Sequence, residues 1–305
     1  MSDIKLFRIY DDSAEELAGR SVTVEKSLQN ILEQHLETFL GVRFLATEYN
    51  TGKKHAGRID TLGIDENNSP VIIEYKRAVN ENVVTQGLFY LDWLLDHKAE
   101  FELMVMRTYG IEVSNAIEWS SPRLLCIAGG FTKFDRHAVE QIHRNIELYV
   151  YKYYDEGLLL LELVNATTAQ TMHINEQTEN QRNVSVKVKT VSDYLEQANT
   201  QITDRYEALK AYMMALGDDV QIKILKHYIA FKRIKNFVCL EIHPQTGRIL
   251  LYVKVNPDQV TLENGFTRDV RNIGHFGTGN LEVAITSDAD IERAKHLISM
   301  AYDVS

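Results

Sequence analysis

The spacing of hydrophobic positions changes several times along the first hundred residues, and each change predicts a different element. Apolar residues recur at helical spacing from about Val24 until Gly41 interrupts the run, and they are Leu28, Ile31, Leu32, Leu36 and Leu40. This pattern predicts an amphipathic helix that ends at the glycine. Three strand-like runs follow: VRFLATEY, RIDTLGI and PVIIEYK. The segment DENNSP is dense in turn residues, so the last two runs are expected to form a β-hairpin.

The next stretch alternates between the two kinds of pattern. Apolar positions between about Val83 and Asp96 predict a helix, and the run FELMVMRT after it predicts a strand. RLLCIAGG is almost continuously apolar, which is typical of a strand buried on both faces of a sheet. A helix from about Lys133 to Ile146 is expected to lead into two further strands, YVYKYY and LLLLELV. Strands that alternate with helices predict an α/β domain with a mixed sheet flanked by helices.

The pattern fades between residues 165 and 190, where Asn, Gln and Thr dominate the sequence NATTAQTMHINEQTENQRNVSVKVKT. We interpret this segment as a linker, and a short strand at VSVKVK is the alternative. The chain would then consist of one domain in residues 1–164, the linker in 165–190, and a second domain in 191–305.

The second domain has a different pattern. A helix from about Ser192 to Leu216 precedes the strand-like runs IKILKHYIAFK, FVCLEIHP, RILLYVKV and LEVAITS. The apolar spacing in DADIERAKHLISMAYDV predicts a closing helix. This arrangement predicts an α+β domain, in which an antiparallel sheet carries helices on one side.

Charge is distributed unevenly along the 305 residues. The formal net charge of −10 argues against nonspecific nucleic-acid binding by the whole surface. Between Gln221 and Arg271, however, nine cations face four anions, a net charge of +5. Such a segment is either a local phosphate-binding patch or a solvated face, and the sequence leaves both interpretations open.

Neither targeting nor metal binding through cysteine is indicated. No run reaches the roughly 18 apolar residues that a membrane span requires, and the first residues lack the pattern of a signal peptide. A cytoplasmic location is the default expectation. Cys126 and Cys239 each lie in an apolar run, which predicts two buried free thiols.

Three charged residues in the predicted hairpin carry the candidate chemistry. Asp60 and Glu74 each lie seven positions from Asn67, so a turn centred there would place them opposite each other, with Lys76 on the same face. Two adjacent carboxylates repel unless a cation lies between them. Mg²⁺ prefers oxygen ligands and keeps several waters, so it fits such a pair. The alternative is an ordinary cross-strand salt bridge between Lys76 and one carboxylate on a solvated face.

The stretch from about Glu25 to Trp93 resembles the PD-(D/E)XK nuclease superfamily, in particular its branch related to NucS-like endonucleases and restriction-type enzymes. The matching pieces stand in the family's order: EKSLQNILEQHLETFLG, FLATEYNTGKKHAGRIDTLGID, SPVIIEYKR and TQGLFYLDWL. Ile59 replaces the proline that precedes the aspartate in the family's motif. The match covers about a quarter of the chain and implies a restriction-endonuclease-like fold.

The resemblance also implies roles for individual residues. Asp60 and Glu74 would bind Mg²⁺ or Mn²⁺, with the backbone carbonyl of Tyr75 as a further ligand. Lys76 would assist the attacking water.

Two more positions of the family's motif lie on the flanking helices. Gln86 would position a phosphate or the site itself, and Tyr90 lies on the same helical face, four residues later. The acidic residue of the first helix falls on Glu25, with Glu33 as the alternative.

The C-terminal part resembles a second, uncharacterised family through YIAFKRIKNFVCLEIHPQTGRILLYVKV and TRDVRNIGHFGTGNLEVAI. Its members are often labelled predicted transport proteins, a label that the absence of a membrane segment does not favour. GHFGTGN is either a glycine-rich loop that approaches phosphate or a plain turn. The first of these segments mixes aromatics with cations that could stack on bases and contact phosphates, or could form strand core: Tyr228, Phe231, Lys232, Arg233, Lys235 and Phe237. We expect this domain to act as a recognition module.

These patterns predict a metal-dependent nuclease that hydrolyses phosphodiesters in nucleic acid, with DNA as the expected substrate. The alternative is a catalytically silent module that keeps a nuclease-like fold and binds nucleic acid or protein. A homodimer is expected by analogy, because two sites cut two strands most easily.

Overall fold

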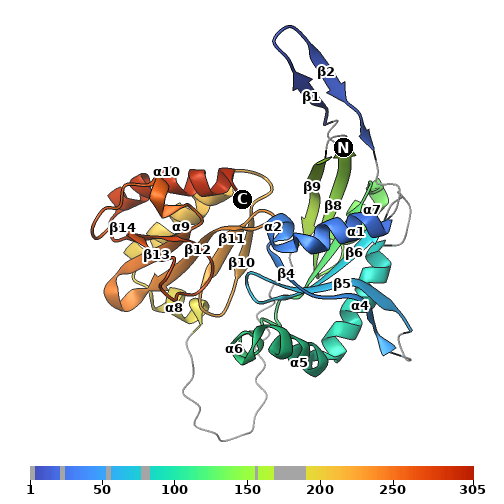
Figure 1. The fold of residues 1–305 in the computed structure, drawn as a ribbon. Helices are drawn as coiled ribbons and strands as arrows, with labels where there is room; N and C mark the ends of the chain where they lie inside the picture. The colour runs from blue at the N-terminus through green and yellow to red at the C-terminus, as the bar shows by residue number, and fades with distance from the viewer. Residues whose placement is uncertain (1–3, 21–24, 53–55, 77–82, 155–156, 168–189) are drawn as a thin grey trace, which may run out of the picture. The chain divides into compact units, whose positions relative to one another are not determined.

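The structure is a computed structural model, and it describes residues 4–20, 25–52, 56–76, 83–154, 157–167 and 190–305 (Figure 1). The chain forms two compact units, unit 1 from Met1 to Met172 and unit 2 from His173 to Ser305. The division falls within the predicted linker. Residues 165–167 of that linker instead end a strand, and residues 168–189, which include VSVKVK, lie outside the described residues. The domain boundaries at 164 and 191 stay predictions.

Unit 1 begins with a β-hairpin and a broken helix. Strands β1 (Leu6–Ile9) and β2 (Ala14–Leu17) pair antiparallel. The predicted single helix is two: α1 (Glu25–Gln34) and α2 (Leu36–Leu40). Gly41 follows with a φ of 63°, the left-handed conformation that suits glycine after a helix.

The body of unit 1 is a mixed sheet, as predicted, and seven of its strands lie in the described residues. The strand order is β3-β8-β7-β6-β5-β4, and β9 pairs with β8. Neighbouring strands from β4 to β6 run antiparallel, whereas β6, β7 and β8 run parallel. The strands are β3 (Gly19–Arg20), β4 (Val42–Asn50), β5 (Arg58–Asp65), β6 (Pro70–Lys76), β7 (Arg123–Ala128), β8 (Asn145–Tyr154) and β9 (Leu158–Thr167).

Helices pack on both faces of this sheet (Figure 1). Helix α4 (Val83–Asp96) packs against β6 and β7, where a Cβ on Gly87 would meet the Leu124 side chain at 2.4 Å. Helix α1 packs against β5 and β6. Because side chains alternate along a strand, Ile72 faces α4 while Ile73 faces the other side. The remaining helices are α5 (Lys98–Tyr109), α6 (Ile111–Asn115) and α7 (Lys133–Glu140).

Two predictions in this region are wrong. The run FELMVMRT is not a strand but most of helix α5, in which Phe101 and Val105 are buried one turn apart while Leu103 and Met106 are exposed. The apolar run therefore has helical rather than strand periodicity. The helix that begins at Lys133 ends at Glu140, and β8 already begins at Asn145.

A buried ionic cluster ties together one end of the sheet. Arg123 at the start of β7 bonds to Glu147 of β8 at 2.8 Å and to Asp65 of β5 at 3.0 Å. Asp65 also accepts the backbone N–H groups of Asn67 and Ser69, which fixes the β5–β6 turn. Burial alone would lower the pKa of Arg123, but the carboxylates of Glu147 and Asp65 raise it. The guanidinium therefore stays charged in the core.

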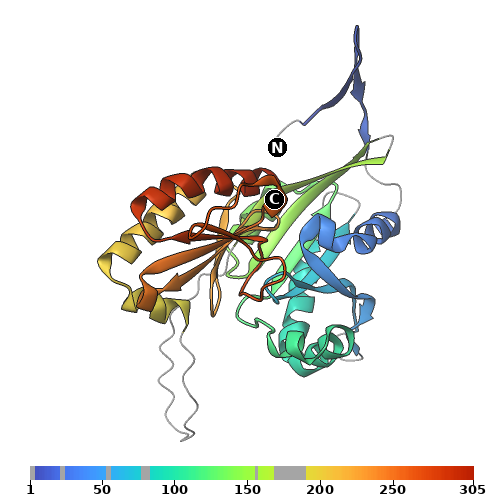
Figure 2. The same ribbon diagram turned by 60° about the vertical axis from the view of Figure 1, so that its left-hand side comes forward.

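Unit 2 is an antiparallel sheet with helices on one side, as predicted (Figure 2). The described part of this sheet has six strands where four strand-like runs were expected, and the single helix predicted from about Ser192 to Leu216 is two helices. The strand order is β10-β11-β12-β13-β15-β14. The run IKILKHYIAFK is a hairpin of two strands, because the backbone turns between Leu225 and Tyr228. The elements are α8 (Val191–Gln197), α9 (Thr200–Met214), β10 (Gln221–Ile224), β11 (Ile229–Lys232), β12 (Asn236–His243), β13 (Arg248–Val253), β14 (Thr267–Asp269), β15 (Leu281–Ile285) and α10 (Asp288–Asp303).

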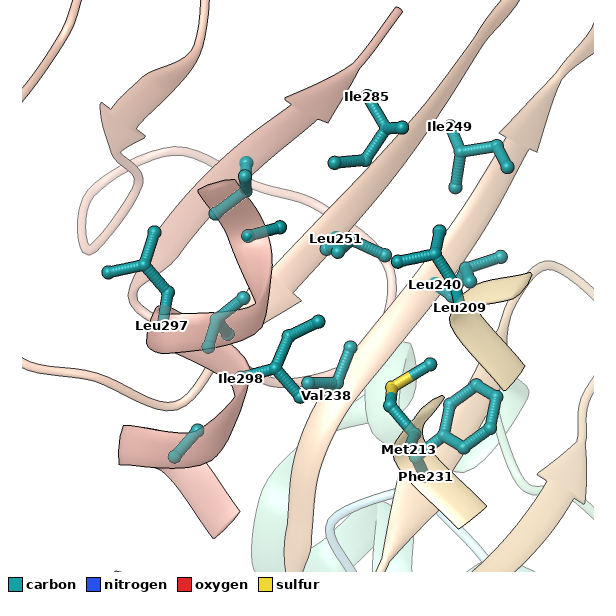
Figure 3. Close-up of a cluster of buried hydrophobic side chains, with 14 of the residues drawn as sticks. Leu209, Met213, Phe231, Val238, Leu240, Ile249, Leu251, Ile285, Leu297 and Ile298 are labelled. Carbon is teal, nitrogen blue, oxygen red and sulfur yellow. The ribbon is translucent and has the colours of Figure 1, made fainter. Parts of the chain in front are cut away.

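The core of unit 2 lies between its sheet and its helices (Figure 3). Leu209 and Met213 of α9 and Ile298 of α10 pack on Leu240 and Leu251 from the centre of the sheet. All five side chains are fully buried, so each contributes about 1.5–3 kcal/mol of hydrophobic stabilisation.

Both cysteines are free and buried, as predicted. Within the part of the chain that the structure describes, no helix combines the length and the apolar composition that crossing a membrane requires.

Candidate active site

Asp60 and Glu74 lie opposite each other on β5 and β6. The register pairs Thr61 with Ile73 and Leu62 with Ile72, and its continuation places Asp60 beside Glu74. The backbone N–H of Asp60 donates to Glu74 Oε1 at 3.2 Å, and the N–H of Tyr75 donates to Asp60 Oδ2 at 3.0 Å. The hairpin therefore brings the two carboxylates to one face of the sheet.

The environments of the two carboxylates differ. Glu74 is completely buried, whereas Asp60 is half-buried. Within the described residues, Glu74 Oε2 has no hydrogen-bond partner. Burial, together with the negative charge of Asp60, raises the pKa of Glu74 to about 9. Glu74 therefore does not lie on a solvated face, which the interpretation as an ordinary surface salt bridge requires.

A cleft opens beside this pair. It has a volume of about 770 Å³, and its lining includes Asp60, Lys76, Gln86 and Tyr90. Four of the residues singled out from the sequence thus meet at one concave surface. Lys76 is half-buried at the end of β6, two residues beyond Glu74, and its charge lowers the pKa of Glu74 against the larger effect of burial.

One wall of the cleft is held by Tyr90. Its hydroxyl accepts the side-chain N–H of Gln86 at 3.2 Å and the backbone N–H of Arg58 at 3.1 Å. The helix α4 is thereby fixed to the start of β5. A Cβ on Gly57 would lie 2.5 Å from the Tyr90 ring. Gly57 thus lets the strand approach the ring, a role that sequence reasoning missed although the glycine precedes Arg58 in the GRID motif.

The other residues named from the resemblance lie elsewhere. The Tyr75 ring is on the opposite face of β6, where its hydroxyl lies 3.3 Å from that of Thr61 and is fully buried. Its backbone carbonyl as a ligand stays a prediction. Glu33 bonds to Thr61 on that same far face, so it lies away from the carboxylate pair. Glu25 begins α1, and its side chain lies outside the described residues.

Helix α1 packs on the opposite face of the sheet and contacts the backbone of the site. The buried Gln29 side chain donates to the backbone carbonyl of Asp60 at 2.7 Å and to Thr47 at 3.1 Å. The amide thus couples the helix to the strand at the position of the aspartate. Sequence reasoning did not single out Gln29, because a glutamine on a helix carries no recognisable signal by itself.

The chemistry of these donors suits a hard divalent cation. Asp60 and Glu74 offer oxygen atoms, and the buried Oε2 of Glu74 has no hydrogen-bond partner within the described part of the chain, so a cation could bind it. Among the described residues, no group of three or more His, Cys, Asp or Glu could hold a metal ion. A pair of carboxylates is enough for Mg²⁺, which keeps several waters and commonly shares substrate phosphates.

In unit 2 the glycine-rich run GHFGTGN forms a strap over the sheet. The backbone N–H of Phe276 donates to Glu241 at 3.3 Å, and that of Thr278 donates to Cys239 Sγ at 3.3 Å. Gly277 has a φ of 77°, and a Cβ there would meet Cys239. Because these two N–H groups bond to the protein, they are not available to a phosphate, which favours the interpretation of the run as a turn over that of a phosphate-binding loop.

Comparison with known families identifies one match in unit 2. Residues 191–305 match the family described as a domain of unknown function, DUF5655. That description carries no transport function, so the label predicted transport protein has no support. An uncharacterized protein of Haemophilus influenzae is 28% identical over 304 residues, which are 98% of this chain and 99% of that protein.

Two solved structures are similar to part of the chain. A repair endonuclease from Pyrococcus abyssi is 19% identical with a TM-score of 0.28, over 42% of this chain and 48% of that one. The EndoMS-dsDNA2 complex is 13% identical with a TM-score of 0.24, over 48% of this chain and 65% of that one. The chain spans less than two thirds of either. TM-scores this low support no conclusion about activity, so the function must be inferred from the residues of the site.

Proposed function

We propose that unit 1 is a metal-dependent nuclease that hydrolyses phosphodiester bonds in nucleic acid, with DNA as its substrate. One observation carries the proposal. Asp60 and Glu74 face each other across adjacent strands, and the buried Glu74 oxygen has no hydrogen-bond partner among the described residues. A buried carboxylate beside a second carboxylate is costly unless a cation or a proton accompanies it. The motif resemblance adds the expectation that this cation is Mg²⁺ or Mn²⁺.

The residues around the pair suit the handling of a phosphodiester. Asp60 and Glu74 would hold the cation, and the carbonyl of Tyr75 would complete the protein ligands. Lys76 lines the cleft beside Asp60, so its ammonium group can orient the attacking water and offset phosphate charge. Gln86 can direct its amide toward a phosphate while Tyr90 fixes its position. When bound, the metal would lower the pKa of a coordinated water and stabilise charge on the phosphoryl oxygens.

The experiment that tests the proposal uses the full chain and a panel of substrates. Supercoiled plasmid, linear duplex, single-stranded DNA and single-stranded RNA are incubated with protein and Mg²⁺ or Mn²⁺, and with a chelator in parallel. We expect DNA cleavage that requires the metal. Absence of cleavage on every substrate by a folded protein that still binds DNA would instead favour the silent binding module. Sedimentation of the same protein would test the predicted homodimer.

A further inference from the structure

Charge in unit 2 is distributed unevenly between its helices and its strands and turns. Helices α8, α9 and α10 carry eight carboxylates against four cations, a net charge of −4. The strands and turns between Gln221 and Arg271 carry +5. The helices cover one face of the sheet, so most negative charge lies on the helical side and the positive charge lies in the sheet and its turns.

The register shows which side chains occupy the other face. Lys223, Ala230, Cys239, Tyr252, Glu282 and Arg268 form one row across the six strands. Ala230, Cys239 and Tyr252 belong to a small apolar cluster that is separate from the core beneath the helices. Because paired residues in a sheet point to the same side, Lys223 and Arg268 lie on this face. We call it the helix-free face.

The carboxylates on this face are engaged by donors of the protein. Glu241 accepts the backbone N–H of Phe276 and lies 2.9 Å from His243 Nε2. Glu282 pairs with Arg268 at 2.6 Å. These contacts reduce the repulsion that the two carboxylates would exert on an approaching anion.

Two stacked aromatic pairs lie along the strap, residues 274–280. The rings of Tyr252 and His275 are 4.1 Å apart, and those of His227 and Phe276 are 4.4 Å apart. Phe276 is nevertheless 51% exposed. Lys226, which is exposed, precedes His227 in the β10–β11 turn. An exposed ring therefore lies beside a turn that carries an exposed cation.

We propose that the helix-free face of unit 2 binds nucleic acid. Lys223 and Lys226 would contact phosphates, and Phe276 would stack on a base. Cations beside exposed aromatic rings are how sequence-tolerant single-strand binders work, because every base has a flat face. An acidic peptide would pair with the lysines but would have no flat group for Phe276. This inference adds a binding surface outside the cleft of unit 1, and it does not depend on cleavage.

The test measures binding of the full chain to labelled single-stranded and duplex DNA by fluorescence anisotropy, with a chelator present to prevent cleavage. We compare Lys226→Glu, Phe276→Ala and the double variant with wild type. The matched control is Lys210→Glu on α9, which makes the same charge change on the helical side and removes an exposed pair with Glu207 and a cation–π contact with Tyr206. Thermal unfolding confirms that each variant is folded.

We expect the double variant to bind single-stranded DNA at least about tenfold more weakly. Lys226→Glu alone should lower the slope of log Kd against log salt by about one, which is the contribution of one phosphate contact. Lys210→Glu should bind as wild type. Unchanged affinity of the double variant, or an equal loss in Lys210→Glu, would overturn the proposal. Binding of polyglutamate as tightly as DNA would also overturn it, in favour of an acidic protein partner.

Cleavage by the same variants separates this proposal from the nuclease. If the protein binds DNA through Phe276 and Lys226 but never cleaves it, the binding proposal stands and the nuclease proposal fails. If the protein cleaves DNA and binds it equally well without these side chains, the nuclease proposal stands and the binding proposal fails.

Discussion

The backbone N–H of Asp60 donates to the side chain of Glu74, and the backbone N–H next to Glu74 donates to the side chain of Asp60. This reciprocal arrangement fixes both carboxyl groups relative to the hairpin rather than to flexible neighbours. The positions of the candidate ligands are therefore set by the register of β5 and β6.

The first prediction concerns the protonation of Glu74 in the metal-free protein. Burial raises its pKa to about 9 in the folded chain, whereas an unfolded glutamate titrates near about 4.3. Between these values the folded state holds a proton that the unfolded state has released, so the free energy of unfolding falls as pH rises. Glu74→Gln removes the titrating group, so its free energy of unfolding should not fall with pH for this reason. We expect the variant to be more stable than wild type at pH 8 by on the order of 5 kcal/mol, since each pH unit above the unfolded pKa costs the wild type about 1.4 kcal/mol, and equally stable at pH 4.

Urea denaturation in a chelator at several pH values measures this difference. Glu37→Gln is the matched control, because Glu37 is exposed on α2. Its stability should follow that of the wild type at every pH. A Glu74→Gln variant with the same pH dependence as wild type would mean that Glu74 is ionised in the folded chain.

The second prediction concerns metal binding itself. A ligand that binds only the folded state stabilises it, by about 2.7 kcal/mol at a hundredfold excess over Kd. Mg²⁺ or Mn²⁺ should therefore raise the unfolding midpoint of unit 1 in the wild type but not in Asp60→Asn or Glu74→Gln. Binding should also release a proton below pH 9, because Glu74 must ionise. An equal metal-dependent shift in all three proteins would place the metal elsewhere.

The third prediction concerns the wall of the cleft. Tyr90→Phe removes the hydroxyl that accepts from Gln86 and from the backbone of Arg58, so Gln86 loses its fixed position. We expect the cleavage rate to fall roughly tenfold or more while the fold is kept. Gly57→Ala should have the same effect, because its new methyl group would displace the Tyr90 ring.

Two comparisons make the third prediction specific. Tyr49→Phe removes a tyrosine hydroxyl that donates to Glu100 outside the lining of the cleft, and it should leave the cleavage rate unchanged. The combination of Gly57→Ala with Tyr90→Phe should cost little more than either change alone. Full additivity would show that the two residues act separately.

The fourth prediction concerns the ionic cluster at the other end of the sheet. Arg123→Met leaves the carboxylates of Asp65 and Glu147 buried without their cation. Breaking a buried pair in this way costs about 3–5 kcal/mol. Arg58→Met removes a pair with Glu48 in which the arginine is 67% exposed, and it should cost less than about 1 kcal/mol. Equal losses measured by denaturation would contradict the structural role of the cluster.

Much of the hairpin could be predicted from the sequence, because its signals are local. The turn residues between Asp65 and Pro70 set the register, so equal distances from Asn67 were enough to pair Asp60 with Glu74. The helical spacing of Gln86 and Tyr90 likewise predicted their contact. The expected order of a helix, three strands and a second helix is confirmed, because each of these elements also has a local signal in the sequence.

Features that depend on tertiary packing could not be predicted. The FELMVMRT run looks like a strand because five of its eight residues are apolar. Only the structure shows that Phe101, Met104 and Val105 pack on the core, at helical spacing, while Leu103 and Met106 are exposed. The lack of a hydrogen-bond partner for Glu74 Oε2 among the described residues depends on what covers β6, and the spacing of residues in the sequence does not reveal this. Cys239 as the acceptor for the strap is equally nonlocal, since the bonded residues are 39 positions apart.

The most direct test of the account compares DNA cleavage by wild type, Asp60→Ala and Lys76→Ala, each with Mg²⁺ or Mn²⁺ and with a chelator. Asp92→Ala serves as the control, because Asp92 is an exposed carboxylate on α4. We expect metal-dependent cleavage by wild type and Asp92→Ala. Lys76→Ala should lose about a hundredfold or more of the cleavage rate, and Asp60→Ala should show no measurable cleavage. Cleavage that survives either Asp60→Ala or chelation would contradict the proposed metal-dependent mechanism.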